Sequence, residues 1–322
     1  MEFGLWNGLL TGSFDYFYES RTDILTQYLT RPQWVGVVMA AGNLGKTKNQ
    51  GVELELKHNN RIGKDFYYNV GFTFSHARNE ILDMDEPDAK TGYRKQEGHP
   101  INQYFGLICD GFVTQADLDN PNFPKSTYGN VQVGDLKYRD MNGDGFIDDR
   151  DETFIGYSDI PENTYALTLG AQWKGIGFSV MFQGVDHVSR FYDAEAMFAF
   201  VNGGKVKEHH LGRWNPAMSE EYNLANATYP LLHYDSYGNH NQRQNSFFLK
   251  NGAFLRLKNI ELSYSLPQSW IKKAAMKECR IYVNASNLVT WDHLGGLTDP
   301  ESNGSNRYPI MKTVNFGVNI QF

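Results

Sequence analysis

Long apolar runs are absent from this sequence of 322 residues. No stretch approaches the roughly 18 consecutive apolar residues that a membrane-spanning helix requires, so a helical membrane protein is excluded. Tyr and Phe are nevertheless plentiful, at 19 and 21 residues, while the mean hydropathy is −0.52. Apolar residues must therefore alternate with polar ones, which favours strands. Any membrane contact has to come from a closed sheet whose backbone groups pair internally.

Clusters of positive charge are also missing. The net charge is −7 and no run is basic, which argues against a nucleic-acid partner because phosphate binding needs grouped Lys and Arg. Only two cysteines occur, Cys109 and Cys279, and they match neither a metal-site spacing nor a disulfide framework. We expect both to be unpaired thiols packed as small apolar groups.

Strict alternation of apolar and polar residues is the main feature that is present. From Phe66 to Ser75 the even positions are apolar and the odd ones mostly polar, as in a strand with two different faces. Residues 52–57 alternate in the same way before the polar turn 59–64, which predicts a hairpin. A second hairpin is predicted where residues 164–173 and 176–183 flank the tight turn Lys174-Gly175.

The rhythm continues, on the order of ten strands in all, each near the length that a tilted strand needs to cross a bilayer. A change of phase after Leu257 predicts a β-bulge near Lys258-Asn259. Short turns alternate with long polar excursions, such as 80–100 and 184–247, as in outer-membrane barrels. A short helix is predicted over 268–276, with Trp270, Ile271 and Ala274 on one face, where it would close a turn or one end of the barrel.

The chain ends on an alternating strand whose last residue is aromatic. We interpret its apolar face as a signal for assembly into the outer membrane; the alternative is the terminal strand of a soluble sheet. The residues of this face are Phe316, Val318, Ile320 and Phe322.

Several segments stand out by their sequence and by their order along the chain. They are Asn49–Leu54, Gly134–Asp148 with Ile155, Gly156 and Pro161 after it, Phe254–Tyr264, Asn284–Leu288 and the terminal Phe322. Together, in this order, they resemble SusC/RagA-type TonB-dependent transporters of the outer membrane. The resemblance implies an all-β fold, the C-terminal portion of a large antiparallel transmembrane β-barrel with long extracellular loops. In the whole protein it implies about 22 strands around a plugged lumen.

No signal peptide, TonB-contacting box or plug domain is recognisable, so we expect residues 1–322 to be one partial barrel domain from a longer product. A part of a barrel would otherwise expose two sheet edges within the membrane. The resemblance implies a Gram-negative outer-membrane importer of glycan or peptide fragments, with outer-membrane lipid around it. Its implied partners are a SusD-like surface lipoprotein and, through the missing N-terminal region, TonB.

A calcium-type loop is the strongest local motif. Oxygen ligands occur at positions 1, 3, 5, 9 and 12 of a twelve-residue loop, with glycine at position 6 and a backbone carbonyl at position 7. The ligands in this order are Asp140, Asn142, Asp144, Phe146, Asp148 and Asp151. The prediction is a structural Ca²⁺ that rigidifies a long connection or shapes an extracellular surface; the alternative is an acidic loop that turns tightly.

The remaining polar and aromatic groups show no catalytic motif or metal-site spacing. The histidines 187, 209, 210, 233 and 240 show no ligand spacing, and we interpret them as solvated loop residues. Asp83, Asp85, Glu86 and Asp88 read as a solvated acidic cluster rather than a catalytic pair. No catalytic motif occurs, so we predict that the chain is not an enzyme. Loop aromatics could stack on sugar rings, or else pack within the loop or at a membrane interface; they are Phe191, Tyr192, Phe198, Phe200 and Trp214.

Two functions from different classes remain at this point. The first is the barrel portion of an energised outer-membrane importer. The second is a soluble, calcium-dependent β-sandwich that binds carbohydrate. They differ in where the apolar rows point, since a barrel turns them toward lipid and a sandwich packs them against each other.

Overall fold

A single large antiparallel sheet dominates the computed structural model, which describes residues 1–28, 30, 40–87, 92–192, 194–234, 239–302, 308 and 310–322. Its nine strands lie in the order β1-β2-β3-β4-β11-β12-β15-β16-β17. Each strand therefore pairs with the strand of this sheet that comes before it in the sequence and with the one that comes after it. The strands are β1 (Glu2–Leu5), β2 (Leu10–Thr26), β3 (Gly42–Ile62), β4 (Phe66–Asp83), β11 (Asn163–Trp173), β12 (Ile176–Asp186), β15 (Phe254–Ser265), β16 (Glu278–Asp292) and β17 (Thr313–Gln321). The described strands form no second large sheet facing this one, so the sandwich alternative is wrong.

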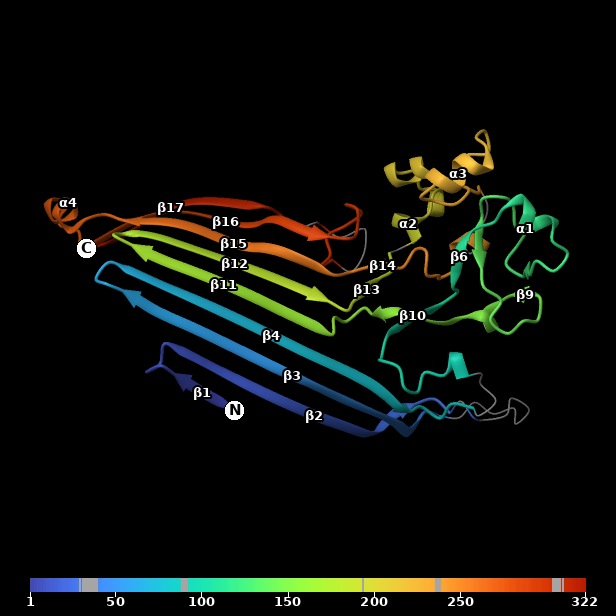
Figure 1. Ribbon diagram of the computed structural model, residues 1–322, viewed down its shortest axis with the longest axis horizontal. Helices are drawn as coiled ribbons and strands as arrows, with labels where there is room; N and C mark the ends of the chain where they lie inside the picture. Colours follow the sequence, from blue (N-terminus) through green and yellow to red (C-terminus); the bar gives the residue numbers. More distant parts are fainter. Residues whose placement is uncertain are drawn as a thin grey trace.

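The two ends of the sheet differ in their connections, as the sequence predicted. Both predicted hairpins form, β3 with β4 and β11 with β12, the second through Lys174-Gly175 with Lys174 at φ +46°. Figure 1 shows the short turns gathered at one end of the strands and the long connections at the other. No helix among the described residues has the length and apolar character to cross a bilayer.

The predicted β-bulge is confirmed at Lys258. Leu257 pairs with Phe182 and Asn259 with Met181, so Lys258 has no direct partner in β12. On the other side of β15, the register also shifts between Leu257 and Asn259. The extra residue restores the outward apolar face after the change of phase.

The long connections fold into a layer of short elements at one end of the sheet, which we call the loop layer (residues 92–162 and 187–253). Its strands are β5 (Gln103–Gly106), β6 (Cys109–Phe112), β7 (Lys125–Ser126), β8 (Leu136–Tyr138), β9 (Phe146–Ile147), β10 (Thr153–Ser158), β13 (Ser189–Arg190) and β14 (Lys250–Asn251). Its helices are η2 (Gly92–Arg94), α1 (Gln115–Asp119), η3 (Asp149–Asp151), α2 (Ala194–Met197), η4 (Val201–Gly203), η5 (Glu208–Gly212), α3 (Glu220–Asn226) and η6 (His240–Gln242). The described part of the excursion 184–247 therefore folds into short elements and is not a plain polar loop.

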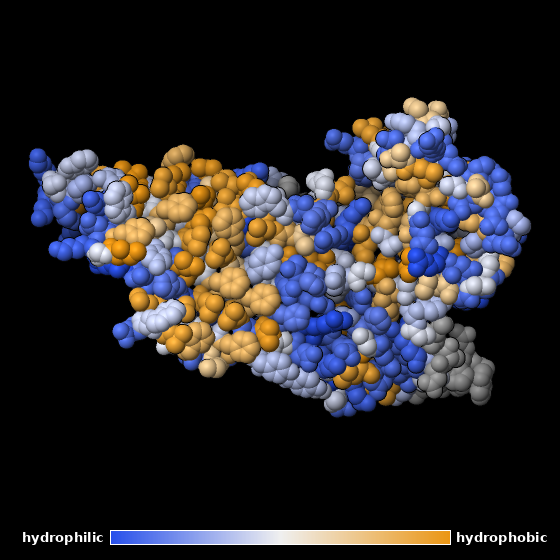
Figure 2. Space-filling model, viewed as in Figure 1, coloured by the Kyte–Doolittle hydropathy of each residue, from blue (hydrophilic) through white to orange (hydrophobic). Residues whose placement is uncertain are grey.

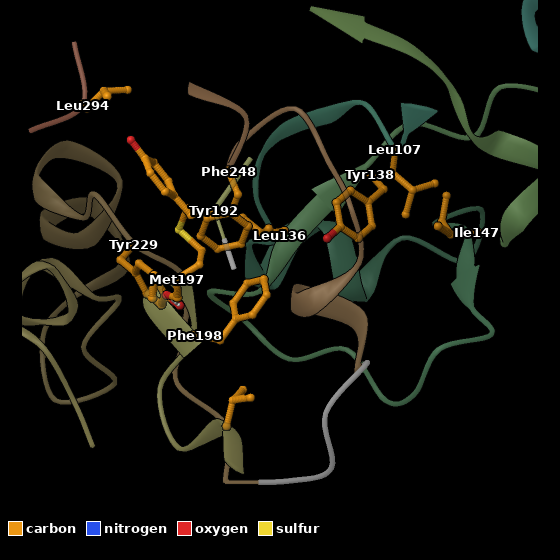
Figure 3. Packing of buried hydrophobic residues seen from close by; sticks show 12 residues of the cluster. Leu107, Leu136, Tyr138, Ile147, Tyr192, Met197, Phe198, Tyr229, Phe248 and Leu294 are labelled. Carbon is orange, nitrogen blue, oxygen red and sulfur yellow. Dashed lines mark hydrogen bonds between the residues drawn. The ribbon is translucent and has the colours of Figure 1, made fainter. Parts of the chain in front are cut away.

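The main apolar core lies in this loop layer. Figure 3 shows its side chains converging from segments that are distant in sequence. Phe248 stands at the centre, with its ring edge-on to Phe198 at 5.0 Å and tilted to Tyr229 at 5.5 Å. The buried cluster around it also includes Leu107, Leu136 and Met197. Several small elements thus gain stability from one shared core, which none of them could build alone.

A short helix forms where the sequence predicted one. Helix α4 (Gln268–Ile271) and η7 (Lys272–Ala274) sit in the β15–β16 turn, where Ile271 is 1% exposed but Trp270 is 64% exposed. The shared face predicted for those two residues is therefore wrong, because successive residues of a helix point in different directions. Cys109 and Cys279 are both free, as expected, and burial raises the pKa of the Cys109 thiol to about 11.

Candidate functional site

One face of the sheet carries apolar side chains on every strand. Directly paired residues of an antiparallel sheet lie on the same face, so rows can be followed from strand to strand. One such row crosses from β4 to β17 through Tyr68, Ala171, Phe178, Leu262, Val283 and Phe316. The alternation read from single strands thus adds up to one continuous surface.

This apolar face is open to the surroundings. Phe178 is 42% exposed, Leu262 52% and Phe316 84%. Figure 2 shows apolar residues gathered over the strands. At the end of the strands where the long connections lie, the lower part of the surface is mainly hydrophilic. In water such a surface would be costly, because exposed apolar patches of soluble proteins rarely exceed a few hundred Å². Lipid chains are the environment that suits it.

Toward the loop layer, the outward positions of the sheet change from apolar to polar and charged residues. Along β4 the outward positions change from Phe74 to His76, Arg78 and Glu80, and Lys48 of β3 forms an ion pair with Glu80 at 2.9 Å. Aromatic side chains mark both borders, as in the girdles of outer-membrane barrels. They are Tyr16, Tyr18 and Trp291 toward the loops, and Trp173 and Tyr264 toward the turns.

The opposite face is polar and internally paired. Asn315 donates its amide to Asn284 on the neighbouring strand at 3.0 Å, and Ser286 donates its hydroxyl to Asn259 at 2.9 Å. Arg280 forms an ion pair with Glu261. These cross-strand contacts suit a wall that faces water, since polar side chains on neighbouring strands satisfy one another.

A charged cluster fastens the β16–β17 connection to this polar face, a feature that the sequence analysis missed. Arg256 is 1% exposed and binds both carboxylate oxygens of Asp299, at 2.7 and 2.8 Å. It also contacts Glu301 and donates to the Thr290 hydroxyl at 2.9 Å. The sequence signal that could have predicted this cluster is a basic residue, Arg256, at a position of β15 that the alternation places on the inward face. The cluster holds residues 299–301 against the inside of the wall.

The terminal strand presents its apolar residues on the outward face. Phe316, Val318 and Ile320 pair with Val283, Ile281 and Cys279 of β16 and are exposed, and Phe322 follows the strand. The described sheet has β17 at one edge. This arrangement is the one that an assembly signal would need; the signalling role itself stays a prediction.

The calcium-type loop adopts the turn geometry that its sequence predicts. Asp140 accepts hydrogen bonds from the backbone of Gly143 and Gly145 at 2.7 and 2.9 Å, and Asp144 accepts from Phe146 at 3.0 Å. Asp151 is fully buried and accepts from the backbone of Met141 and Asp148. The positive φ of Gly145, +81°, permits the sharp turn at position 6.

An arginine of the calcium-type loop binds two of the carboxylates that were predicted to ligate the metal. The Arg150 guanidinium lies 2.7 Å from Asp144 and 2.7 Å from Asp148. Its hydrogen bonds hold the pKa of Asp148 below the ordinary value. Among the described residues, no three Asp, Glu, His or Cys side chains converge as a metal centre would require. The donor set suits calcium in kind, but here an internal cation neutralises part of it.

Two histidines that were interpreted as solvated are buried. His210 is held between the Lys207 backbone N–H, which donates to Nδ1 at 2.8 Å, and the Met197 carbonyl, which accepts from Nε2 at 3.1 Å. His240 donates from Nε2 to the Leu136 carbonyl at 2.7 Å. The solvated interpretation is wrong for both, because the connection folds around a core. Burial lowers the pKa of His240, and that of His210 to about 4.

The acidic cluster is also more ordered than predicted. Asp83 forms an ion pair with Lys46 at 2.9 Å. Glu86 is buried and accepts hydrogen bonds from the backbone of Gln96 and Glu97, so it closes a turn. Asp88 lies outside the described residues.

The loop aromatics divide into core and partly buried residues. Tyr192, Phe198 and Trp214 are buried, so their proposed stacking on sugar rings is wrong, and packing within the loop layer explains them. Phe191 is half-buried beside Tyr104, at 6.4 Å between ring centroids, and Phe200 packs edge-on against Tyr234 at 5.4 Å. Aromatic side chains that a sugar-binding surface would expose are buried here to build the core.

Comparisons with known proteins agree with this geometry. The TonB-dependent receptor P3 of Formosa agariphila is 25% identical over all of this chain, and SusC of Bacteroides thetaiotaomicron is 24% identical, also over the whole chain. The chain spans about a third of the length of these relatives, 33% and 31%. A structure of the RagAB peptide transporter superposes with a TM-score of 0.72 at 22% identity, covering 100% of this chain and 34% of that one.

The family model for the β-barrel of TonB-dependent receptor-like proteins matches residues 2–288. The nine-stranded sheet is accordingly a segment of a large antiparallel transmembrane barrel, with its apolar face outward and its polar face toward the lumen. The chain belongs to the TonB-dependent receptor-like β-barrel family, and its relatives include SusC-type transporters.

Proposed function

We propose that this chain forms part of the wall of an energised importer in the outer membrane of a Gram-negative bacterium. The observation that carries the proposal is the continuous apolar face, which is bordered by aromatic and charged residues and backed by a polar face. Lipid would cover the first face and cargo would pass the second. The loop layer would then lie on the extracellular side, because long loops of outer-membrane barrels face outward.

The importer would act with two partners. The likeness to SusC and to the RagAB transporter supports a SusD-like surface lipoprotein seated over the loop layer. TonB would supply energy through a part of the protein outside this sequence. The RagAB relative is a peptide transporter. We propose that this importer carries peptide or glycan fragments, and that the cargo crosses along the polar face.

Lipid contact can be tested with two neighbouring residues of β12. Phe178 points outward and Ser179 points to the polar face. A fluorophore attached at Phe178→Cys, with Cys109 and Cys279 replaced by Ala, should be quenched by brominated lipids in vesicles. The same label at Ser179→Cys is the matched control and should respond to a water-soluble quencher instead. Equal lipid quenching at both positions would refute the wall proposal.

We also propose that the 140–151 loop binds calcium as a structural ion. The turn geometry around Asp140 and Asp144 supports it, and Asp140, Asn142, Asp144, Asp148 and Asp151 with the Phe146 carbonyl would be the ligands. Bound calcium would supply positive charge that holds the loop, the role that Arg150 fills in part. Because the two cations compete for the same carboxylates, removing Arg150 should favour the metal.

Calorimetry measures this competition directly. We expect Arg150→Gln to bind calcium at least about tenfold more tightly than the unchanged chain. Arg139→Gln is the control, because Arg139 is also paired with a carboxylate, Asp110, but lies outside the loop. No binding heat at millimolar calcium in either the unchanged chain or Arg150→Gln would show that the loop is only a tight turn.

A further inference from the structure

An apolar pocket of about 420 Å³ interrupts the otherwise polar inner face of the sheet. It lies at the loop end, where β2, β3 and β4 meet residues 96–105. Its apolar lining includes Ile24, Ile81, Met84, Ile101, Phe105 and Phe154. The volume falls in the range of pockets that hold small ligands, roughly 300–1,000 Å³.

The register of β4 places this pocket on the polar side of the wall. Ile81 shares a face with Ser75 and Asn79, opposite to the apolar row of Phe72 and Phe74. The backbone of Ile81 pairs with His99 and Gly98, at 2.9 and 2.8 Å, so this segment runs beside β4.

The chain then turns over the polar face. The Ile101 N–H donates to the Asn79 side chain at 2.7 Å, and this side chain points inward. The pocket is therefore open to the lumen side, where cargo would pass, and not to the lipid side.

Gln103 and Lys46, two of the polar residues that line the pocket, are already engaged. The Gln103 amide contacts His99 at 2.9 Å and donates to the Gly156 carbonyl at 2.7 Å. Lys46 is the one charged residue among the described lining residues, and Asp83 pairs with it. Phe154 stacks on His99 at 3.7 Å between ring centroids, which makes a flat aromatic wall.

We propose that this pocket receives an apolar side chain, aliphatic or aromatic, of a peptide cargo. The inference rests on the proposed import function and narrows its cargo class. A sugar ring would bring hydroxyl groups against a lining that is mainly apolar, and each unmatched hydroxyl would lose its hydrogen bonds to water. An apolar side chain loses nothing of this kind and gains contact with Met84, Ile101 and Phe154.

The test uses the intact transporter with its partner, purified in detergent, and three probes. These are the blocked tripeptides Ala-Phe-Ala and Ala-Asp-Ala and a neutral trisaccharide. The phenylalanine peptide should bind at least about tenfold more tightly than the aspartate peptide. Met84→Gln and Ile101→Asn should abolish that preference. Leu82→Asn is the matched control and should preserve it, since Leu82 lies on the same strand, is exposed and does not line the pocket.

Three outcomes would overturn the inference. One is equal binding of the two peptides by the unchanged transporter. Another is that Met84→Gln weakens binding of the trisaccharide but of neither peptide, which would make the pocket a sugar subsite. The third is a Met84→Cys thiol that maleimide cannot reach, because another part of the transporter then fills the pocket. The lipid-quenching experiment reads the import wall independently, so failure of the pocket is distinguishable from failure of the proposed function.

Discussion

The sheet and the loop layer use apolar side chains in opposite ways. On the sheet, Phe178, Leu262 and Phe316 stand exposed on the outside, and the polar residues line the inside. In the loop layer, Phe248 and Tyr192 are buried, and charged groups such as Arg150 lie at the surface. Apolar side chains thus face outward in the sheet and inward in the loop layer, because lipid rather than water is the solvent for the outer face of the sheet.

This difference teaches that the two regions are stabilised by different forces. The sheet relies on its long hydrogen-bonded ladders, which need no core behind them once lipid covers the outer face. The loop layer has only short strands and helices, which are marginal alone and depend on a shared apolar core. Changes to packing should therefore affect the loop layer most, whereas changes to polarity should affect the sheet.

Removing a core ring should give the largest effect. Phe248→Ala leaves a cavity between Phe198 and Tyr229, and we expect the loop layer to lose about 3–5 kcal/mol. Hydrogen exchange of loop-layer amides in the membrane-embedded protein measures this loss. Phe178→Ala is the matched control on the sheet: lipid fills the space, so only the transfer energy is lost, about 1–2 kcal/mol. Equal losses at the two sites would break the comparison.

Adding charge should reverse the order of sensitivity. Phe178→Arg places a cation in the lipid-facing row and should cost about 2–4 kcal/mol of unfolding free energy, measured by denaturant titration in vesicles. Ser179→Arg, one residue along β12 and on the polar face, should change it by less than about 1 kcal/mol. If both variants lose the same free energy, the assignment of the two faces is wrong.

Acid should weaken the loop layer through His210, with a smaller effect. The side chain titrates near 6.5 when unfolded and at about 4 when folded, since burial disfavours the charged ring. The unfolded state binds more protons between these values, so stability is complete above about 6.5 and falls as pH drops toward 4.

Protonation of Nδ1 would also remove its hydrogen bond from the Lys207 N–H. The pH dependence of loop-layer hydrogen exchange should therefore flatten in His210→Gln. His293→Gln, a change at an exposed histidine of the β16–β17 connection, should leave the pH dependence unaltered. An unchanged slope in His210→Gln would show that other groups carry the acid response.

The strands and the bulge could be predicted because their signal is local. Alternation at period two is a property of consecutive residues, and the change of phase at Lys258 is visible without any partner strand. The turn geometry of the 140–151 loop was likewise predictable, since its glycines and acidic residues act within a few positions. Burial of Glu86, His210 and Tyr192 could not be predicted, because it depends on segments that approach from far along the chain.

By itself, the sequence determined which residues share a face and where the strands turn. These follow from spacing, which the extended backbone translates directly into direction. Only the tertiary structure decided that the long connections build their own core, that Arg256 holds residues 299–301 against the wall, and that an apolar pocket lies beside Ile81. Those features arise where residues distant in the chain come together, and their contacts have no counterpart in local spacing.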